Sequence, residues 1–325
     1  MPNVVIGQAL HPEAIAELQR GLGPDYNVID RGSAPLPELL KALESADYVI
    51  TQSFTPQMGE HARKLKLLHA QGSGTDGIAR AALPQGAYVA NVYEHEVAIA
   101  EYIYLAMLAL SRDLLNLDAG LRRGDMGPAG HYGGPMRGEL YGTTVAIIGY
   151  GRIGREVAKR AKVFGQRVLA IKGHPEAGLA ERDGLAFLGG PSDLATVLPR
   201  ADYVVVATPL TPETTGLIGA REIALMKPTA FLINVGRGPV VAEEPLYRAL
   251  RDRKIAGAAL DVWYTYPPVG QLGQPSNFPF QSLSNVIMTP HIAGWTHGTV
   301  NRRMAFIAEN IKRVESGHEP ISRVI

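Results

Sequence analysis

The chain contains no cysteine, which excludes disulfide bonds, thiolate nucleophiles and cysteine-ligated zinc or iron–sulfur centres, and we expect no metal site. It also lacks an excess of either charge, with 32 Lys and Arg residues against 31 Asp and Glu residues. A net charge of +1 gives no bulk attraction to nucleic acid or anionic membranes, so we expect neither as a partner. The most apolar run, Val97–Leu110, contains Glu101 and is too short to span a bilayer about 30 Å thick. With no signal-peptide pattern at the N-terminus, we expect a cytoplasmic protein.

The composition is that of a globular protein, and 325 residues suit two domains. Short apolar runs alternate with helical patterns, which predicts an α/β fold with doubly wound parallel sheets. In the first third we expect helices over 12–20 and 37–43 and strands at 4–6, 48–50, 67–70 and 88–90. A helix over 96–110 follows, and it is apolar nearly all round, so it must be covered on several sides.

A polar, glycine-rich stretch over 111–142 separates this unit from a second one. There we expect strands at 145–148, 167–171, 203–207, 230–234, 257–260 and 286–288. A final helix over 300–315 has an apolar stripe, and we expect it to return to the first unit. The predicted domains are therefore 1–110 plus 296–325, which would bind the substrate, and 111–295, which would bind a dinucleotide.

Two segments have the glycine spacing GxGxxG after a predicted strand: Gly72–Gly77 and Gly149–Gly154. Such a turn followed by a helix binds a pyrophosphate, because free N–H groups and the helix dipole favour negative charge. The helix after Gly154 is unbroken to about Phe164, whereas the segment after Gly77 meets Pro84. We therefore favour the second turn as the dinucleotide site, and the first could be an ordinary strand-to-helix turn.

Four further segments follow the second turn: TPLTPET at Thr208–Thr214, NVGRG at Asn234–Gly238, AALDVW at Ala258–Trp263 and TPHIAG at Thr289–Gly294. With the glycine turn, and in this order and spacing, the chain resembles the D-2-hydroxyacid dehydrogenase family over nearly its whole length. The resemblance implies two flavodoxin-like or Rossmann-like domains, a nicotinamide dinucleotide and a homodimer formed largely through the dinucleotide-binding domains. It also implies that backbone amides of the first glycine turn hold a substrate carboxylate.

The cofactor residues that we predict lie in these segments: Gly149, Gly151, Arg152, Ile153, Gly154, Lys172, Thr208, Pro209, Val235, Asp261 and Ala293. By resemblance, Asp261 and Thr208 would line the nicotinamide and pyrophosphate regions. An NAD-specific site places a carboxylate about 20 residues beyond the first glycine, where it binds the ribose 2′-OH. Lys172 stands near this position, 23 residues after Gly149, so we predict NADP as the preferred cofactor and NAD as the alternative.

Reduction of a 2-oxo acid needs a cation for the carboxylate and the carbonyl, and a proton donor for the developing alkoxide. Arg237 suits the first task, because its planar guanidinium binds carboxylates in a fork, although an arginine in a glycine turn could also be a surface residue. His291 suits the second task, although a lone histidine is often structural.

The carboxylate that partners this histidine in the family would fall at Tyr266, so the usual acid is absent and we include Tyr266 among the catalytic residues. Glu94 or Glu96 could replace it, or their charges could complement a helix dipole. The predicted substrate-binding residues are Gly72, Ser73, Gly74, Glu94, His95 and Trp295. How Tyr93, Tyr264, Tyr266 and Trp295 pack would decide which substrate side chain fits.

The sequence therefore predicts an NAD(P)-dependent reductase of small 2-oxo acids that works in reverse as a D-2-hydroxyacid dehydrogenase. The missing carboxylate leaves open a formate-type anion dehydrogenase, because formate oxidation needs no proton donor. Some relatives of this fold act as dinucleotide-sensing corepressors, which is the third alternative.

Overall fold

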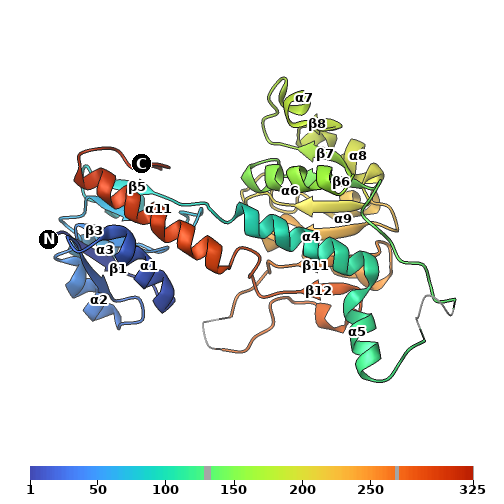
Figure 1. Cartoon of the computed structure of the whole chain (residues 1–325), viewed down its shortest axis with the longest axis horizontal. Helices are drawn as coiled ribbons and strands as arrows, with labels where there is room; N and C mark the ends of the chain where they lie inside the picture. The colour runs from blue at the N-terminus through green and yellow to red at the C-terminus, as the bar shows by residue number, and fades with distance from the viewer. Residues whose placement is uncertain (128–132, 268–270, 325) are drawn as a thin grey trace. The chain divides into compact units, whose positions relative to one another are not determined.

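The computed structural model describes residues 1–127, 133–267 and 271–324, and its contacts divide the chain into two compact units. Unit 1 comprises Met1–His95 and Thr296–Ile325, and unit 2 comprises Glu96–Trp295. Each unit is built on one parallel sheet with helices on its faces (Figure 1). Both predicted α/β units are therefore present.

Unit 1 has a five-stranded parallel sheet in the order β2-β1-β3-β4-β5, which is the flavodoxin-like order. Its strands are β1 (Asn3–Ile6), β2 (Asn27–Asp30), β3 (Tyr48–Ile50), β4 (Leu67–His69) and β5 (Tyr88–Ala90). Its helices are α1 (Pro12–Leu22), α2 (Leu36–Leu43), α3 (Pro56–His61) and α11 (His297–Glu315). One core cluster joins the sheet to α1 and α11, and another joins it to α2 and α3, so both faces are covered.

Unit 2 has a seven-stranded parallel sheet in the order β12-β11-β10-β9-β6-β7-β8. Its strands are β6 (Thr144–Ile148), β7 (Arg167–Ile171), β8 (Phe187–Gly189), β9 (Tyr203–Val206), β10 (Phe231–Asn234), β11 (Gly257–Leu260) and β12 (Val286–Met288). The strand order reverses between β6 and β9, and ligands of open α/β sheets bind at such a switch point.

Helices also cover both faces of the second sheet. They are α4 (Glu96–Arg112), α5 (Leu114–Arg122), α6 (Arg152–Val163), α7 (Leu179–Asp183), α8 (Leu194–Val197), α9 (Ala220–Ala224) and α10 (Glu243–Arg251). Residues of α4 and α6 share one core cluster, and residues of α8, α9 and α10 contribute to the other. No helix among the described residues is long and apolar enough to cross a membrane.

The structure differs from the sequence-based expectations at the first domain boundary. Contacts place it between His95 and Glu96, not after residue 110, because α4 buries Ile103 and Met107 in the unit 2 core with α6 and the sheet. The stretch after residue 110 is more than a connection between the two units, since it contains the helix α5. Strands β2 and β8 were not predicted, and both are short edge strands without fully apolar runs.

Candidate functional site

The carboxyl edge of the unit 2 sheet collects most of the predicted site residues. Strands β6, β9 and β10 are followed by Gly149, Thr208 and Arg237, and strands β11 and β12 by Asp261 and His291. Because parallel strands end at one edge, segments that are up to 142 residues apart in the sequence meet at this edge.

The turn after β6 depends on its glycines, because two of the three stand where a side chain would not fit. Gly149 has φ 105, and a Cβ atom there would lie 2.7 Å from the Ala207 carbonyl oxygen. A Cβ atom on Gly154 would lie 2.7 Å from the Gly149 carbonyl oxygen, so this glycine allows close packing of helix and turn. A Cβ atom on Gly151 would meet nothing within 4 Å, and α6 begins at the next residue. The turn thus leaves open space at a helix N-terminus, which suits a pyrophosphate.

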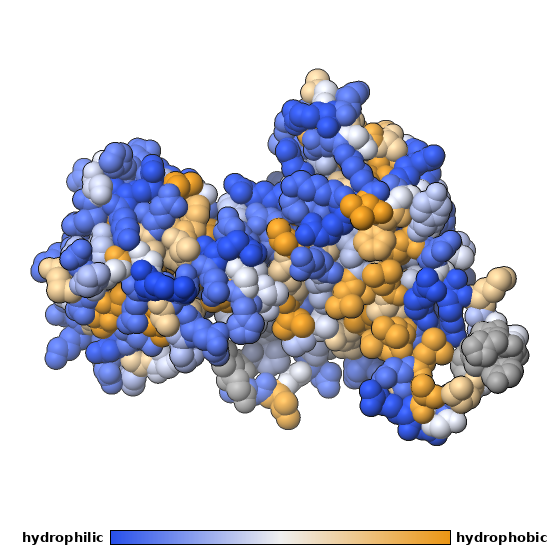
Figure 2. Space-filling view, viewed as in Figure 1, coloured by the Kyte–Doolittle hydropathy of each residue, from blue (hydrophilic) through white to orange (hydrophobic). Residues whose placement is uncertain are grey.

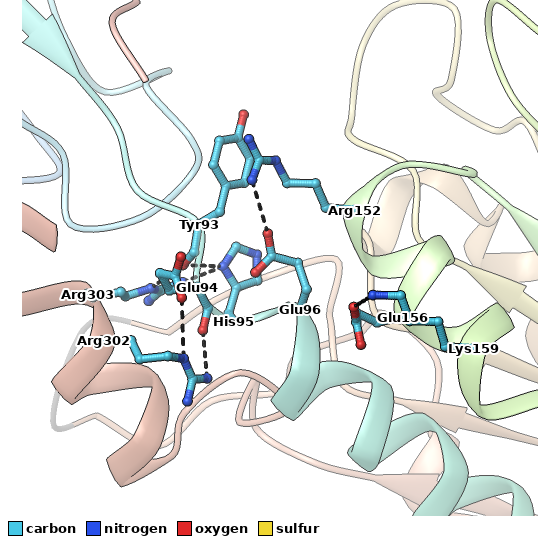
Figure 3. Close-up of polar contacts among 9 residues, drawn as sticks. All are labelled: Tyr93, Glu94, His95, Glu96, Arg152, Glu156, Lys159, Arg302 and Arg303. Atoms are coloured by element: carbon cyan, nitrogen blue, oxygen red, sulfur yellow. Dashed lines mark hydrogen bonds and ion pairs between the residues drawn. The ribbon is translucent and has the colours of Figure 1, made fainter. Parts of the chain in front are cut away.

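The other predicted cofactor residues lie around this turn. Thr208 is buried and donates to the Ile148 carbonyl oxygen at 2.9 Å, and Ile153 packs against the core. Val235 and Ala293 are buried, whereas Pro209 is exposed. Arg152 is at the start of α6, with its Nη1 atom 3.9 Å from Glu96 of α4 (Figure 3).

Lys172 follows β7 directly, as the sequence predicts. Its Nζ atom lies 3.5 Å from the carboxylate of Glu176. The cation expected beside a 2′-phosphate therefore has an anionic neighbour. A bound phosphate would have to replace the Glu176 carboxylate or bind beside it.

Arg237 lies in a turn whose backbone is hydrogen-bonded to the Asn234 side chain. The Asn234 side chain accepts from Gly236 N at 3.1 Å and donates to the Arg237 carbonyl oxygen at 3.2 Å. A Cβ atom on Gly238 would lie 2.2 Å from the Trp263 carbonyl oxygen, so the chain passes too close for any other residue. Arg237 itself is exposed and donates to the Gly236 carbonyl oxygen at 2.8 Å. A fixed turn therefore presents a solvent-accessible guanidinium.

His291 and Tyr266 are brought together, as expected from their places in the sequence. The Tyr266 hydroxyl lies 3.1 Å from His291 Nδ1 and accepts a hydrogen bond from Trp263 N at 3.1 Å. Burial lowers the pKa of His291 below its usual value, and the nearby Arg237 charge lowers it further, while Asp261 opposes both. The structure thus gives this imidazole a neutral hydroxyl partner at the position where the resemblance implies an acid.

Asp261 holds the loop that carries His291. Its buried carboxylate accepts from Thr289 Oγ1 at 2.6 Å, from Ile292 N at 2.9 Å and from Ala293 N at 2.9 Å. The Tyr102 hydroxyl of α4 lies 2.6 Å from Thr289 Oγ1 and extends this network. His291 has φ 59, a conformation that non-glycine residues seldom adopt, so the loop constrains its backbone.

The predicted substrate-binding residues of unit 1 lie at the carboxyl edge of its own sheet. The glycine turn that contains Gly72, Ser73 and Gly74 follows β4, and a short 3₁₀ turn at Arg80–Ala82 replaces the helix that usually follows such a turn. The Glu94 carboxylate lies 3.4 Å from Arg302 Nε, and His95 Nδ1 lies 2.8 Å from Arg303 Nη2 (Figure 3). Trp295, the last residue of unit 2, is 57% exposed.

Several residues that support the site were not predicted as site residues: Gln52, Asn91, Tyr102, Asn234 and Thr289. Asn234 and Thr289 stand inside the quoted motifs, at the end of one strand and directly after another, and this was a usable signal. Gln52, Asn91 and Tyr102 stand outside those motifs, and their roles depend on contacts with residues from 18 to 187 positions away.

Comparisons with known proteins identify the family of this chain. Residues 104–293 match the family model described as D-isomer specific 2-hydroxyacid dehydrogenase, NAD binding domain. A D-3-phosphoglycerate dehydrogenase of Methanocaldococcus jannaschii is 34% identical over 323 residues, which cover 98% of this chain and 58% of that relative. The chain therefore spans little more than half of that protein. A glyoxylate reductase of Thermococcus gammatolerans is 33% identical, with 98% of this chain and 94% of the relative covered.

Solved structures are similar over the full length. The TT0316 protein from Thermus thermophilus matches with a TM-score of 0.81 and 30% identity, covering 99% of this chain and 100% of that one. A D-2-hydroxyisocaproate dehydrogenase matches with a TM-score of 0.86 and 24% identity, covering 100% of this chain and 99% of that one. At that identity, the second match supports the fold alone.

Proposed function

The chain belongs to the D-isomer specific 2-hydroxyacid dehydrogenase family, and from this premise we propose that it reduces small 2-oxo acids to D-2-hydroxy acids. One observation carries the proposal: Arg237 and His291 stand at the same sheet edge as a glycine turn suited to a dinucleotide. The names of the glyoxylate reductases that match this chain support a small 2-oxo acid as substrate.

The residues around the glycine turn fit a nicotinamide dinucleotide. The open space at Gly151 and the N–H groups at the start of α6 would hold the pyrophosphate, with Thr208 beside them. When bound, the reduced nicotinamide supplies the hydride. Unit 2 is thus an NAD-binding domain of the family, and the residues below supply the remaining chemistry.

We assign two tasks to Arg237 and one to His291. The guanidinium binds the substrate carboxylate and would stabilise the negative charge that develops on the carbonyl oxygen when hydride is added to the carbonyl carbon. His291, in its protonated form, gives its proton to the same carbonyl oxygen. Tyr266 orients the imidazole through Nδ1, and Asp261 holds the loop and supplies the negative field that Tyr266 does not.

The test is the oxidation of NADH and NADPH, followed by absorbance near 340 nm, with a panel of 2-oxo acids. We expect turnover of at least one small 2-oxo acid, and a loss of about 10²- to 10⁴-fold in Arg237→Ala and in His291→Ala. The matched controls are Arg248→Ala, at an exposed residue, and His61→Ala, at a half-buried one, and both should keep wild-type rates. Wild-type rates in both site variants would contradict the assignment.

The same panel separates the two alternatives. Tyr266 in place of a carboxylate favours oxidation of formate, which needs no proton donor, so NAD⁺ reduction by formate is measured alongside. Binding of the dinucleotide without turnover of any anion would favour a sensing role.

We also propose NADP as the preferred cofactor, on the position of Lys172 directly after β7. A lysine there attracts a 2′-phosphate, whereas an NAD-specific site has a carboxylate that repels it. Glu176 weakens this argument without reversing it, because its side chain is exposed and can move from the 3.5 Å contact with Lys172.

An exposed apolar surface on unit 2 supports a homodimer. It consists of Leu105, Leu108, Leu114, Leu115 and Leu121, which are between 37% and 62% exposed. Figure 2 shows apolar side chains gathered over α4 and α5. A patch of this kind marks an interface more often than free surface. Light scattering after size-exclusion chromatography should give a dimer, and Leu105→Glu with Leu115→Glu should give a monomer.

A further inference from the structure

Three consecutive carbonyl groups of the unit 1 glycine turn each accept a hydrogen bond. The Gly72 oxygen accepts from Val92 N at 3.3 Å, and the Ser73 oxygen accepts from Asn91 Nδ2 at 2.8 Å. The Gly74 oxygen accepts from Gln52 Nε2. These donors come from segments that follow β3 and β5, the two strands that flank β4.

The N–H groups of the same peptide units must point the other way. In a trans peptide the N–H is antiparallel to the C=O, so the Ser73 amide faces away from Val92 N, the Gly74 amide away from Asn91 and the Thr75 amide away from Gln52. In the parts of the chain that the structure describes, no hydrogen bond uses these three N–H groups. Successive free N–H groups form an anion-binding concavity.

Gln52 is itself held firmly. Its backbone N–H donates to Gln8 Oε1 at 2.9 Å, and Phe54 N donates to the Gly77 carbonyl oxygen at 2.9 Å. A Cβ atom on Gly77 would lie 2.7 Å from the Gln52 carbonyl oxygen, so the two segments touch closely. The Gln52 side chain therefore spans between two fixed backbones.

We propose that Gln52 and Asn91 are positioning residues for the substrate carboxylate: they fix the turn so that its N–H groups, and not its carbonyl oxygens, face the anion. Glycine allows either orientation of a peptide plane at little cost, so the sequence of the turn alone does not select one. A carbonyl turned outward would repel a carboxylate. This proposal rests on the proposed function, which makes a 2-oxo acid the ligand.

The sharpest variant is Gln52→Met, which keeps the length of the side chain and removes the donor. We expect the KM for the best 2-oxo acid to rise about tenfold, kcat to change less than about twofold, and the Kd of reduced cofactor to stay unchanged. Gln52→Lys keeps a donor of similar reach and should restore most of the KM. Asn91→Asp removes the second donor and should raise the KM in the same way.

The controls separate positioning from general damage. Asn27→Asp changes an exposed amide of the same unit that bonds only to Asn3, and it should leave KM and kcat unchanged. A 2-oxo amide, which lacks the carboxylate, should show no KM change in Gln52→Met. An unchanged KM for the acid, or a KM change of equal size for the amide, would overturn the proposal.

Direct titration with oxamate, a small unreactive carboxylate, keeps the proposal testable without turnover. We expect weaker binding in Gln52→Met than in the wild type, with Gln52→Lys between them. Equal affinities, or no binding to the wild type, would contradict the role of Gln52. Absence of turnover with every 2-oxo acid, together with normal oxamate binding, would instead overturn the proposed function alone.

Discussion

The carboxyl edges of the two sheets carry glycine turns of the same spacing but are chemically different. In unit 2 the turn leads into the 12-residue helix α6, and charged or titratable side chains lie along the same sheet edge: Arg152, Lys172, Arg237, Asp261 and His291. In unit 1 the turn leads into no long helix, and neutral amides of Gln52 and Asn91 support it. In our proposals, one six-residue pattern serves two kinds of anion site.

The difference predicts which properties depend on pH. Backbone N–H groups and carboxamides do not titrate, so anion binding by the unit 1 turn should be constant across neutral pH. The unit 2 edge contains an imidazole with a lowered pKa, so the chemical step should vary with pH. Variants at the two edges can therefore be distinguished by the pH dependence of their activity as well as by the size of the activity loss.

The largest expected effect is at Gly151. A Cβ atom there meets nothing in the protein, so Gly151→Val should fold normally but fill the space proposed for the pyrophosphate. We expect the Kd of the cofactor to rise about 10²-fold or more, because charge-assisted hydrogen bonds from the turn are lost. Calorimetric titration gives the Kd, and thermal unfolding without cofactor is the control. Normal cofactor binding would place the pyrophosphate elsewhere.

The second effect concerns His69, which ends β4 just before the unit 1 turn. Burial lowers the pKa of His69 to about 4. Between about pH 6.5 and 4 the unfolded chain binds a proton that the folded chain does not, so the free energy of unfolding decreases as the pH is lowered through this range. The loss at the acid end should be about 3 kcal/mol, and His69→Gln should lack it.

The probe for this prediction must report on unit 1. Both tryptophans, Trp263 and Trp295, lie in unit 2, so their fluorescence does not follow unit 1. Hydrogen exchange of β3 and β4 amides, corrected for intrinsic rates, is the suitable measurement. An unchanged pH slope in His69→Gln would assign the acid sensitivity to other groups.

A smaller effect is expected at Tyr266. Reduction needs protonated His291, whose pKa lies below about 6.5, so kcat/KM should fall as pH rises through that region. In Tyr266→Glu a carboxylate should raise this apparent pKa by about one unit and extend reduction toward alkaline pH. Tyr266→Phe is the control and should keep the low value.

The alternative is that Glu94 or Glu96 already supplies the negative charge that would raise the pKa of His291. Each lies near an arginine instead, Arg302 for Glu94 and Arg152 for Glu96, which favours Tyr266 as the partner of His291. Glu94→Gln and Glu96→Gln should therefore leave the pH profile in place. A wild-type profile that is flat between pH 6 and 9 would remove His291 as the donor.

The smallest effect concerns the choice of cofactor. We expect wild-type kcat/KM to favour NADPH, and the preference to drop about fivefold in Lys172→Ala, as for a single partly exposed ion pair. Glu176→Gln should increase the preference, because it removes the anion beside Lys172. A wild-type preference for NADH of more than tenfold would contradict the prediction.

Much of the fold could be predicted from the sequence, because parallel strands buried on both faces are continuous apolar runs. The bounds of β3, β5, β7, β11 and β12 agree with the sequence-based ranges. The edge strands β2 and β8 could not be found in this way, since Asn27–Asp30 has a polar residue at each end and Phe187–Gly189 has only two apolar residues before a glycine. Helix α4 was predicted, but the unit to which it belongs was not. A helix that is apolar nearly all round does not specify which core it packs against.

The site could be predicted where motif residues follow strands directly, as for Arg237 and His291. It could not be predicted where the proposed site depends on contacts distant in sequence: Gln52 reaches Gly74 from the segment after a neighbouring strand, and Tyr102 reaches Thr289 from a helix. No sequence pattern indicated that Asp261 accepts three hydrogen bonds from the His291 loop. The cytoplasmic location stays a prediction.

The placement of α11 has a consequence for synthesis on the ribosome. Unit 2 is one continuous segment, so it is complete once Trp295 has emerged, whereas unit 1 still lacks Met304, Ile307 and Ile311 from its core. At about 5 to 20 residues per second, the first 95 residues wait many seconds for the helix that covers one face of their sheet. During this wait the nascent chain exposes apolar surface around α1. Unit 1 is therefore the part of the chain with the greater need for a chaperone.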